Sequence, residues 1–386
     1  MVLKSIYPLR NHVYCLCLLL LSSCTSMINI PLEQPELEKV ISQNIILMDS
    51  NDFQALPSSL VENEIIFLGE IHNSRPLITA ASHFAVYLAN QKPVVYALEA
   101  CYGSHPLFEE VSLGGEKQIN PDIYTEIIRT FNSNKPIDKK IMMTALDLEH
   151  AIYHTKAATV TFLKDLAQRS NSDNAIQYLD KEIGLLTVQN TYDKMDSYLN
   201  NLKNLFQKYF DTFPPDDRKE INFSFKLLKA SNLYQYIRRG LKNDHRKSDD
   251  IRYKYFTETI KRAYHKAKQR DSILICRIGN WHLKLDNKKG EARYFAKKYS
   301  KTKGKVAAIR MVPIYENAEN NKISQDNIID SIAKNLMEDC QYSYLSLHEL
   351  KKAANNSFKW NEHFSKSGPK YDAILFVKVK DTSNSK

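Results

Sequence analysis

The sequence predicts an α/β fold: a mostly parallel central sheet flanked by helices, with a helical insertion forming a cap over the sheet edge. Short, nearly all-apolar runs recur along the chain, at 64–68, 93–98, 141–146, 272–278, 305–309 and 371–377. Such continuous apolar runs are typical of parallel strands that are buried on both faces. Segments with apolar residues at helical spacing separate several of these runs, as in strand–helix–strand units.

Chemically capable side chains follow these runs at the points where they end. Glu70 and His72 follow the first run, and residues two apart in an extended segment point the same way. Glu99 and Asp147 end the second and third runs, and His282 follows the fourth. The carboxyl ends of neighbouring parallel strands meet at one edge of a sheet, so we expect these side chains to converge there. The alternative is that the acidic residues are helix N-caps or loop charges, and that Glu70 and His72 are ordinary polar residues of a strand-to-helix loop.

The beginning of the chain has the pattern of a signal peptide. Lys4 and Arg10 accompany an apolar stretch at 13–21, which is shorter than the roughly 20 residues that a membrane-spanning helix needs. The sequence therefore predicts export.

The four residues at 21–24, Leu-Ser-Ser-Cys, resemble the lipobox of bacterial lipoproteins. That resemblance implies removal of residues 1–23 and a lipid on Cys24, which would anchor the protein to a membrane. Thr25 follows the cysteine, at the position where aspartate is associated with retention in the inner membrane. The resemblance thus implies the outer membrane of the bacterial cell envelope, and an ordinary signal peptide is the alternative.

Cysteine content and charge exclude some classes of function. Of six cysteines, Cys101, Cys276 and Cys340 lie beyond the lipobox, at spacings that indicate neither a disulfide framework nor a metal site. The net charge is +10, and a basic run occurs at 238–247, where acidic residues interleave with it. We expect this run to be a solvated helix end, with anionic lipid headgroups as a minor alternative. Since the protein is expected to be exported, nucleic acid is not an expected partner.

The chain divides into segments of different character. Residues 24–60 are polar and are expected to form a tether and lead-in, while 61–150 and 269–380 form the α/β domain. Between these two parts, 151–268 has apolar residues at spacings of three and four, which predicts a helical insertion. This insertion is expected to act as a lid or in substrate selection, and a packing role alone is the alternative.

Several motifs resemble one superfamily, which contains erythromycin-esterase-like hydrolases, ChaN-like haem-uptake lipoproteins and Tiki-type proteases. The residues at 69–72, Gly-Glu-Ile-His, look like the Gly-Glu-x-His of ChaN-like domains, whereas erythromycin esterases usually place one more residue before the histidine. The run at 96–99, Tyr-Ala-Leu-Glu, matches the strand-end glutamate of both groups. The pair at 131–132 followed by the strand ending at 145–147 is similar to the esterase pattern, and the run from 371 resembles its closing strand.

A second set of motifs carries the same resemblance further along the chain. Arg252 near the start of a helix, followed by Gly-Asn-Trp-His at 279–282, resembles the paired arginine and strand-end histidine motifs. Tyr253 stands where an acidic residue is usual and Phe256 where methionine is usual, so these positions depart from the pattern. The resemblance covers most of residues 60–380 apart from the helical insertion.

The leading hypothesis for these residues is a hydrolase acting on an ester, lactone or amide-type bond of a small-molecule substrate. Either His72 or His282 would activate a water as general base, since imidazole titrates near neutral pH. Either Glu70 or Glu99 would orient that imidazole, and Arg252 or Arg75 would stabilise the oxyanion. The catalytic residues predicted are His72, Glu70, Glu99, His282, Arg252 and Asp147. The sequence contains no Gly-x-Ser-x-Gly nucleophile elbow, so a serine esterase is not indicated.

Two alternatives remain open from the sequence. In a metal-assisted variant, a divalent ion such as zinc or manganese would be held by Glu70, His72, Glu99 and His282, although there is no His-Glu-x-x-His motif. In the other alternative, the protein binds haem for uptake without catalysis, as the likeness to ChaN implies. The chain has 22 tyrosines, so no haem ligand can be named.

Overall fold

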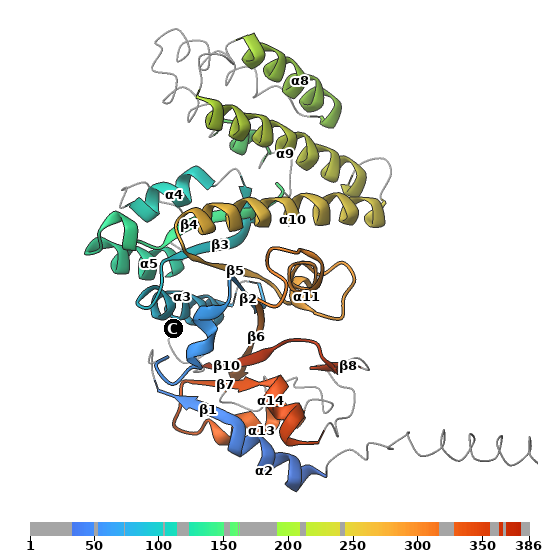
Figure 1. The fold of residues 1–386 in the computed structure, drawn as a ribbon. Helices are drawn as coiled ribbons and strands as arrows, with labels where there is room; N and C mark the ends of the chain where they lie inside the picture. The colour runs from blue at the N-terminus through green and yellow to red at the C-terminus, as the bar shows by residue number, and fades with distance from the viewer. Residues whose placement is uncertain are drawn as a thin grey trace, which may run out of the picture.

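The computed structural model describes the chain in segments, which are residues 33–49, 53–72, 74–102, 105–113, 123–149, 155–160, 162, 191–208, 214–239, 244–315, 328–355, 363–365 and 368–379. Its centre is one sheet of eight strands, β1 (Ile45–Met48), β2 (Ile65–Glu70), β3 (Val94–Cys101), β4 (Met142–Asp147), β5 (Ile273–Gly279), β6 (Val306–Tyr315), β7 (Tyr342–Ser346) and β10 (Ala373–Val379). The strand order is β1-β7-β10-β6-β2-β5-β3-β4 (Figure 1). A separate two-stranded hairpin joins β8 (Phe364–Ser365) to β9 (Gly368–Pro369).

The six apolar runs correspond to β2, β3, β4, β5, β6 and β10. Each of these strands pairs in parallel with its neighbours in this group. Only the pairings of β7, with β1 and with β10, are antiparallel among the described strands of this sheet. The predicted fold class, α/β with a mostly parallel central sheet, is therefore confirmed.

Two strands, β1 and β7, were not indicated by the sequence pattern. β1 lies inside the segment 24–60, which the sequence predicts to be a tether and lead-in, and it forms one edge of the sheet. It has only four residues, and Leu47 in it is 42% exposed. Such a short strand is defined by its hydrogen bonds to β7 rather than by a periodic pattern of its own.

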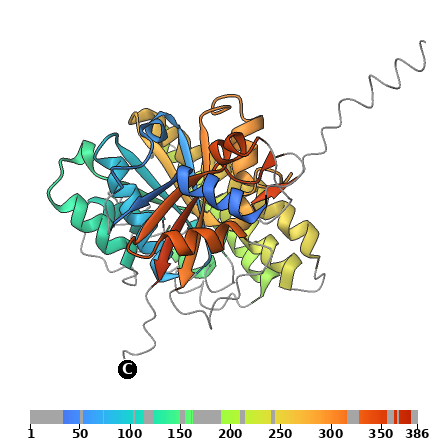
Figure 2. The same ribbon diagram turned by 90° about the horizontal axis from the view of Figure 1, so that it is seen from below.

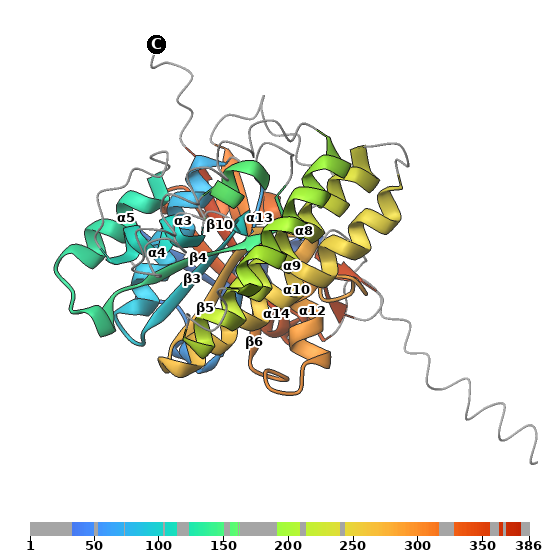
Figure 3. The same cartoon turned by 90° about the horizontal axis from the view of Figure 1, so that it is seen from above.

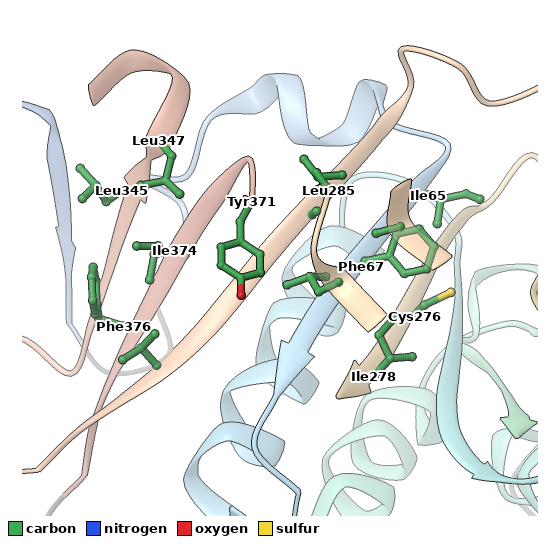
Figure 4. Packing of buried hydrophobic residues seen from close by; sticks show 14 of the residues in the cluster. Ile65, Phe67, Cys276, Ile278, Leu285, Leu345, Leu347, Tyr371, Ile374 and Phe376 are labelled. Carbon is green, nitrogen blue, oxygen red and sulfur yellow. The ribbon is translucent and has the colours of Figure 1, made fainter. Parts of the chain in front are cut away.

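Helices cover both faces of the sheet (Figure 2). One face packs against α3 (Arg75–Ala89), α4 (His105–Leu113) and α5 (Ile123–Ser133). The other packs against α2 (Gln34–Asn44), α10 (His245–Gln269), α12 (Glu291–Arg293) with the adjoining π-helix Tyr294–Lys298, α13 (Ile328–Leu336) and α14 (Leu347–Ala353). Alternate residues of a strand supply the two layers, so Phe67 joins the second layer, seen in Figure 4, while Ile66 and Leu68 join the first.

Three helices rise from one side of the sheet as a stack (Figures 1 and 3). α8 (Tyr192–Lys208) packs on α9 (Pro215–Arg239), and α9 packs on α10. α10 also packs on β3, β4 and β5, and its Phe256, Ile260 and Ala263 belong to the core of the sheet. α10 therefore covers the sheet and carries α9, although it falls within the predicted insertion at 151–268. The division of the chain into domains stays a prediction.

Some features predicted from the sequence cannot be placed. The signal-peptide residues Lys4 and Arg10, the lipobox Cys24 and the following Thr25 lie outside the described residues. Within the described ranges, no helix is both long and apolar enough to cross a membrane. Cys276 is fully buried in β5, and all three cysteines described are free.

Candidate active site

Four neighbouring strands bring the predicted residues to one edge of the sheet. Glu70 is the last residue of β2, Glu99 lies near the end of β3, and Asp147 is the last residue of β4. His282 lies in α11 (Asn280–Leu283), which follows β5 directly. Because these strands are neighbours in the order β2-β5-β3-β4, their carboxyl ends meet, and the side chains lie within reach of one another.

Glu99 is at the centre of this group. Its Oε1 lies 2.5 Å from Nη2 of Arg252, 3.5 Å from Nε2 of His282 and 3.8 Å from Nε2 of His72. Its Oε2 accepts a hydrogen bond of 2.5 Å from the backbone N–H of Gly279. Burial alone would raise the pKa of Glu99, but the hydrogen bond and charge of His282, together with Arg252, lower it. Glu99 is therefore a carboxylate at neutral pH.

His282 is buried between two carboxylates. Its Nδ1 lies 2.7 Å from Oε2 of Glu291 and its Nε2 faces Glu99, while the ring of Phe256 packs edge-on at 5.0 Å. Burial lowers the pKa of His282, but the hydrogen bonds to Glu291 and Glu99 outweigh burial and raise it to about 9. At neutral pH this imidazole carries a positive charge.

His72 is the more accessible of the two histidines, since 59% of its side chain is exposed. Its Nδ1 lies 3.5 Å from Oε1 of Glu70, and Oε2 of Glu70 lies 3.0 Å from Nε of the buried Arg277. The hydrogen bond to Glu70 is the main cause that raises the pKa of His72; burial opposes it, and the charge of Glu99 adds to it. Arg277 therefore fixes the carboxylate of Glu70, and Glu70 in turn orients the exposed imidazole of His72.

Arg252 reaches the site from α10. Its Nη2 contacts Oδ2 of Asp147 at 2.5 Å, and its Nε contacts Oδ1 of the same residue at 3.0 Å. Asp147 is fully buried and also accepts a hydrogen bond from the backbone N–H of Leu148. Burial alone would lower the pKa of Arg252. The negative charges of Asp147 and Glu99 outweigh burial, so the pKa lies above its ordinary value. Asp147 therefore holds Arg252 in place from behind.

A cavity of about 460 Å³ lies over these groups; its lining residues are Glu70, Ile71, His72, Glu99, Arg238, Asp249, Arg252, Tyr253, Gly279, Asn280, Trp281, His282 and Glu291. The lining includes five of the six residues predicted to be catalytic, while Asp147 sits behind it. Arg75, the predicted alternative to Arg252, begins α3 and is not among these described lining residues. Arg238, from the predicted basic run, is one of them.

Two charged residues that contact predicted site residues, Arg277 and Glu291, were not predicted, and neither were Ile71, Asp249 and Trp281 of the lining. Arg277 lies inside the apolar strand β5, which is buried on both faces. A charged residue at such a position is unusual, and this was the only sequence feature that could have indicated its role. Glu291 follows His282 by nine residues across a turn. Nothing in its local sequence pattern indicates that its side chain folds back under the histidine.

Close approach of side chains explains two glycines here. A Cβ atom on Gly279 would lie 2.9 Å from Nε2 of His72 and 3.4 Å from Oε2 of Glu99. A Cβ atom on Gly69 would lie 2.5 Å from Oδ1 of Asn280 and 2.5 Å from Cδ2 of Leu283. Gly279 leaves room for the reactive groups, and Gly69 lets α11 pack closely on β2.

The residues of the predicted metal site have other partners in this arrangement. Glu99 already accepts hydrogen bonds from Arg252 and from the backbone N–H of Gly279. The two ring nitrogens of His282 face the carboxylates of Glu99 and Glu291. Within the described part of the chain, no group of three His, Cys, Asp or Glu side chains is placed to hold a metal ion. In the structure, Glu70, His72, Glu99 and His282 belong to a network of ion pairs with Arg252, Arg277 and Glu291, and their role as metal ligands stays a prediction.

The lining also differs from a haem site. Haem binding without catalysis predicts a flat apolar slot with a lone tyrosine or histidine ligand. Here His72 stands between the carboxylates of Glu70 and Glu99, and charged side chains make up much of the lining. Haem binding stays a prediction.

Comparison with known proteins shows the fold. The sequence matches no protein-family model and no curated protein. A protein from Bacillus cereus has a TM-score of 0.63 at 13% identity, and the match covers 91% of this chain and 98% of the other. A succinoglycan biosynthesis protein has a TM-score of 0.59 at 12% identity, covering 90% and 97%.

A mutant of the erythromycin esterase EreC, in its open conformation, has a TM-score of 0.54 at 11% identity, covering 86% of this chain and 97% of the esterase. The predicted resemblance to erythromycin-esterase-like proteins is thus confirmed for the fold. Haem-bound ChaN of Campylobacter jejuni matches with a TM-score of only 0.34, so the ChaN part of the resemblance stays a prediction.

Proposed function

We propose that this protein is a hydrolase that cleaves an ester, lactone or amide-type bond with a water molecule activated by His72. One observation carries the proposal: an exposed imidazole lines a cavity and is flanked by two carboxylates, Glu70 at 3.5 Å and Glu99 at 3.8 Å. An imidazole placed in this way can accept a proton from water and pass it on. The fold shared with an erythromycin esterase supports the same class of reaction.

The two histidines take different roles in this proposal. His282 has both nitrogens on carboxylates and a pKa of about 9, so it is already protonated at neutral pH and does not serve as the base. The accessible His72 serves as the base, and Glu70, held by Arg277, orients its ring. His282 and Arg252 place positive charge beside the cavity.

The proposed reaction has two proton transfers through His72. Water attacks the carbonyl carbon while Nε2 of His72 takes its proton, since Nδ1 faces Glu70, and the carbonyl oxygen becomes an oxyanion. The positive charges of Arg252 and His282 stabilise this oxyanion. When the oxyanion collapses, the bond to the leaving group breaks and His72 returns the proton to that group.

The location of the protein is part of the proposal. The lipobox-like sequence at 21–24 supports a bacterial lipoprotein that is anchored in the cell envelope through Cys24, with the outer membrane as its destination. The hydrolase would then act outside the cytoplasm on a small molecule that reaches the envelope.

Hydrolysis assays on the purified protein test the proposed reaction. The substrates are 4-nitrophenyl butyrate and a panel of lactones and amides, and His72→Ala is compared with the wild type. We expect His72→Ala to lower kcat/KM by about 100-fold or more, which is the usual contribution of a general base. His83→Ala is the matched control, because His83 lies on α3 and is not among the described cavity-lining residues. Equal activity of wild type and His72→Ala would contradict the proposal, as would a lack of turnover on the whole panel.

A further inference from the structure

The cavity beside His72 has two exposed apolar side chains in its wall. The described residues include seven large hydrophobic side chains that are exposed, which are Leu47, Ile71, Leu113, Ile137, Leu233, Trp281 and Tyr315. Two of them, Ile71 at 50% and Trp281 at 51%, line this cavity. Ile71 is the residue between Glu70 and His72, and Trp281 directly precedes His282. Exposed apolar side chains in a cavity that also has charged groups in its wall indicate contact with a ligand.

The shape of Trp281 indicates what kind of ligand group it contacts. Its ring packs edge-on against the ring of His282 with the centroids 5.2 Å apart, at an interplanar angle of 83°, and half of the residue remains exposed. An exposed indole face offers a large, rigid surface for stacking with planar or ring-shaped groups. Because β2 and β5 are neighbours, Ile71, which follows β2, and Trp281, in α11 directly after β5, both lie beside His72.

The charges of the lining disfavour an anionic ligand. Each arginine or protonated histidine of the described lining is bound to a carboxylate: Arg238 to Asp249 at 2.6 Å, Arg252 to Glu99 and Asp147 at 2.5 Å, and His282 to Glu291 at 2.7 Å. Apart from the proposed base His72, the lining has four carboxylates, Glu70, Glu99, Asp249 and Glu291, and three cations. A carboxylate or phosphate on the ligand would meet cations that are already paired, and the carboxylates of the lining would repel it.

We propose that the substrate is an uncharged ester or amide with a planar or ring-shaped apolar part that stacks on Trp281 and contacts Ile71, and that the site rejects molecules carrying a carboxylate or phosphate near the reacting bond. This inference rests on the proposed function, because it takes the cavity beside His72 as the substrate site. Asp249 contributes to the rejection, since it occupies Arg238 at the cavity.

Fluorescence of Trp281 gives a direct measure of binding. The chain has two tryptophans, Trp281 and Trp360, so Trp360→Phe leaves Trp281 as the single emitter in the full chain. The two probes are 4-nitrobutyranilide and 4-nitrosuccinanilic acid, whose nitrophenyl rings quench indole fluorescence. They differ only in a terminal methyl group, which is replaced by a carboxylate in the second probe. Both are stable amides, and release of yellow nitroaniline would reveal any cleavage.

The expected result is saturable quenching by the uncharged probe, with a Kd about tenfold or more below that of the anionic probe. Asp249→Asn, in the same background, removes one carboxylate and releases Arg238, so it should reduce the difference between the two probes severalfold. Ile71→Ala should weaken binding of the uncharged probe about fivefold, because it removes apolar contact without emptying a buried core.

Two outcomes would overturn the inference: equal or tighter binding of the anionic probe, or no saturable quenching by either probe. Hydrolysis of 4-nitrophenyl butyrate by the wild type is measured beside these titrations. Selective binding of the uncharged probe without ester hydrolysis would support this inference and count against the proposed function. Ester hydrolysis with no preference between the probes would support the proposed function and overturn this inference.

Discussion

At the scale of residues, one carboxylate couples two histidines with different environments. Oε1 of Glu99 faces Nε2 of both His72 and His282. Glu291 lies behind His282 and keeps it protonated, so that His282 neutralises part of the charge of Glu99. The negative charge of Glu99 raises the pKa of His72. Because His282 neutralises part of that charge, the pKa of His72 is raised less than it would be by Glu99 alone. A base and a fixed cation can then exist side by side.

The first prediction concerns the charge of His282 and the stability of the fold. Its pKa of about 9 lies above the ordinary value of 6.5, so protonated His282 stabilises the folded state. This contribution is complete below pH 6.5 and is lost as the pH rises through about 9, and it amounts to about 3 kcal/mol. Glu291→Gln should remove most of this pH dependence, because the strongest acceptor of the imidazolium loses its charge.

Chemical denaturation at a series of pH values between 6.5 and 9 checks this prediction. The free energy of unfolding should fall more steeply with pH in the wild type than in Glu291→Gln. Glu126→Gln, on an exposed position of α5, is the control and should keep the wild-type slope. Parallel curves for wild type and Glu291→Gln would show that Glu291 does not hold the charge on His282.

The second prediction separates two glycines by their effects. Gly279→Ala places a methyl group against the exposed ring of His72, which must move, so we expect kcat/KM to fall about tenfold or more with little change in stability. Gly69→Ala instead drives a methyl group into Leu283 and Asn280, and should cost about 1–3 kcal/mol of stability. Assays of ester hydrolysis and thermal melts of both variants give the comparison. A stability loss at Gly279 with unchanged activity would contradict the proposed position of His72.

Sequence reasoning located the strand-end residues because their positions follow from fold class alone. Glu70, Glu99 and Asp147 each end an apolar run, and parallel neighbours bring such ends together. It could not choose between His72 and His282 as the base, since that choice depends on burial and on Glu291. Contacts from residues behind the site arise only in the folded chain, so local sequence patterns do not reveal them.

At the scale of elements, a partly buried ion pair joins α9 to α10, and a hydrogen bond links it to Tyr102, which follows β3. Glu220 of α9 pairs with Arg262 of α10 and accepts a hydrogen bond of 2.7 Å from the hydroxyl of Tyr102. The guanidinium of Arg262 also lies over the ring of Phe223 at 4.1 Å. These contacts fix α9 on α10, whose start carries Asp249 and Arg252 of the cavity.

The third prediction is that this ion pair holds α9 in place. Arg262→Gln leaves Glu220 partly buried without its cation and should cost about 2 kcal/mol. Adding Glu220→Gln to that variant should recover part of the loss, so the two substitutions are not additive. Urea unfolding of the two single variants and the double variant forms the test, with hydrogen exchange of α9 to locate the change. Strictly additive losses would show that the two side chains do not interact.

The elements themselves were predictable where their pattern was long or strongly apolar. The parallel strands and the helical segments with apolar residues at spacings of three and four belong to that group. β1 was missed because four residues in a polar lead-in carry no period. The sequence analysis assigned α10 to the insertion alone. In the structure, one side of α10 packs against α9 and the other side packs against the sheet.

At the scale of the whole molecule, the fold is shared with proteins of very different sequence. Matches at 11–13% identity extend over 86–91% of this chain. A common fold does not fix a common substrate, and specificity resides in the residues that line the site. In this chain those include Ile71, Trp281 and the pair of Arg238 with Asp249.

The fourth prediction concerns the proposed anchor of the whole protein. If Cys24 carries a lipid, the protein expressed in a bacterium should fractionate with membranes, and Cys24→Ser should release it or leave the signal peptide uncleaved. Mass spectrometry of the N-terminal peptide detects the added lipid, and Cys340→Ser is the control. Unchanged membrane fractionation of Cys24→Ser, with an unmodified N-terminal peptide in the wild type, would contradict lipid anchoring.

An NMR titration of the histidine side chains tests most directly whether His72 is the base. It measures whether His72 loses its proton at a pH at which His282 still keeps one. The two signals are assigned by their disappearance in His72→Ala and His282→Ala. We expect His72 to titrate above its ordinary 6.5 but at a lower pH than His282, which titrates at about 9. A pH range must then exist in which His72 is neutral and His282 is charged. If His282 lost its proton first, His72 would not be the base of this site and the proposed mechanism would be wrong.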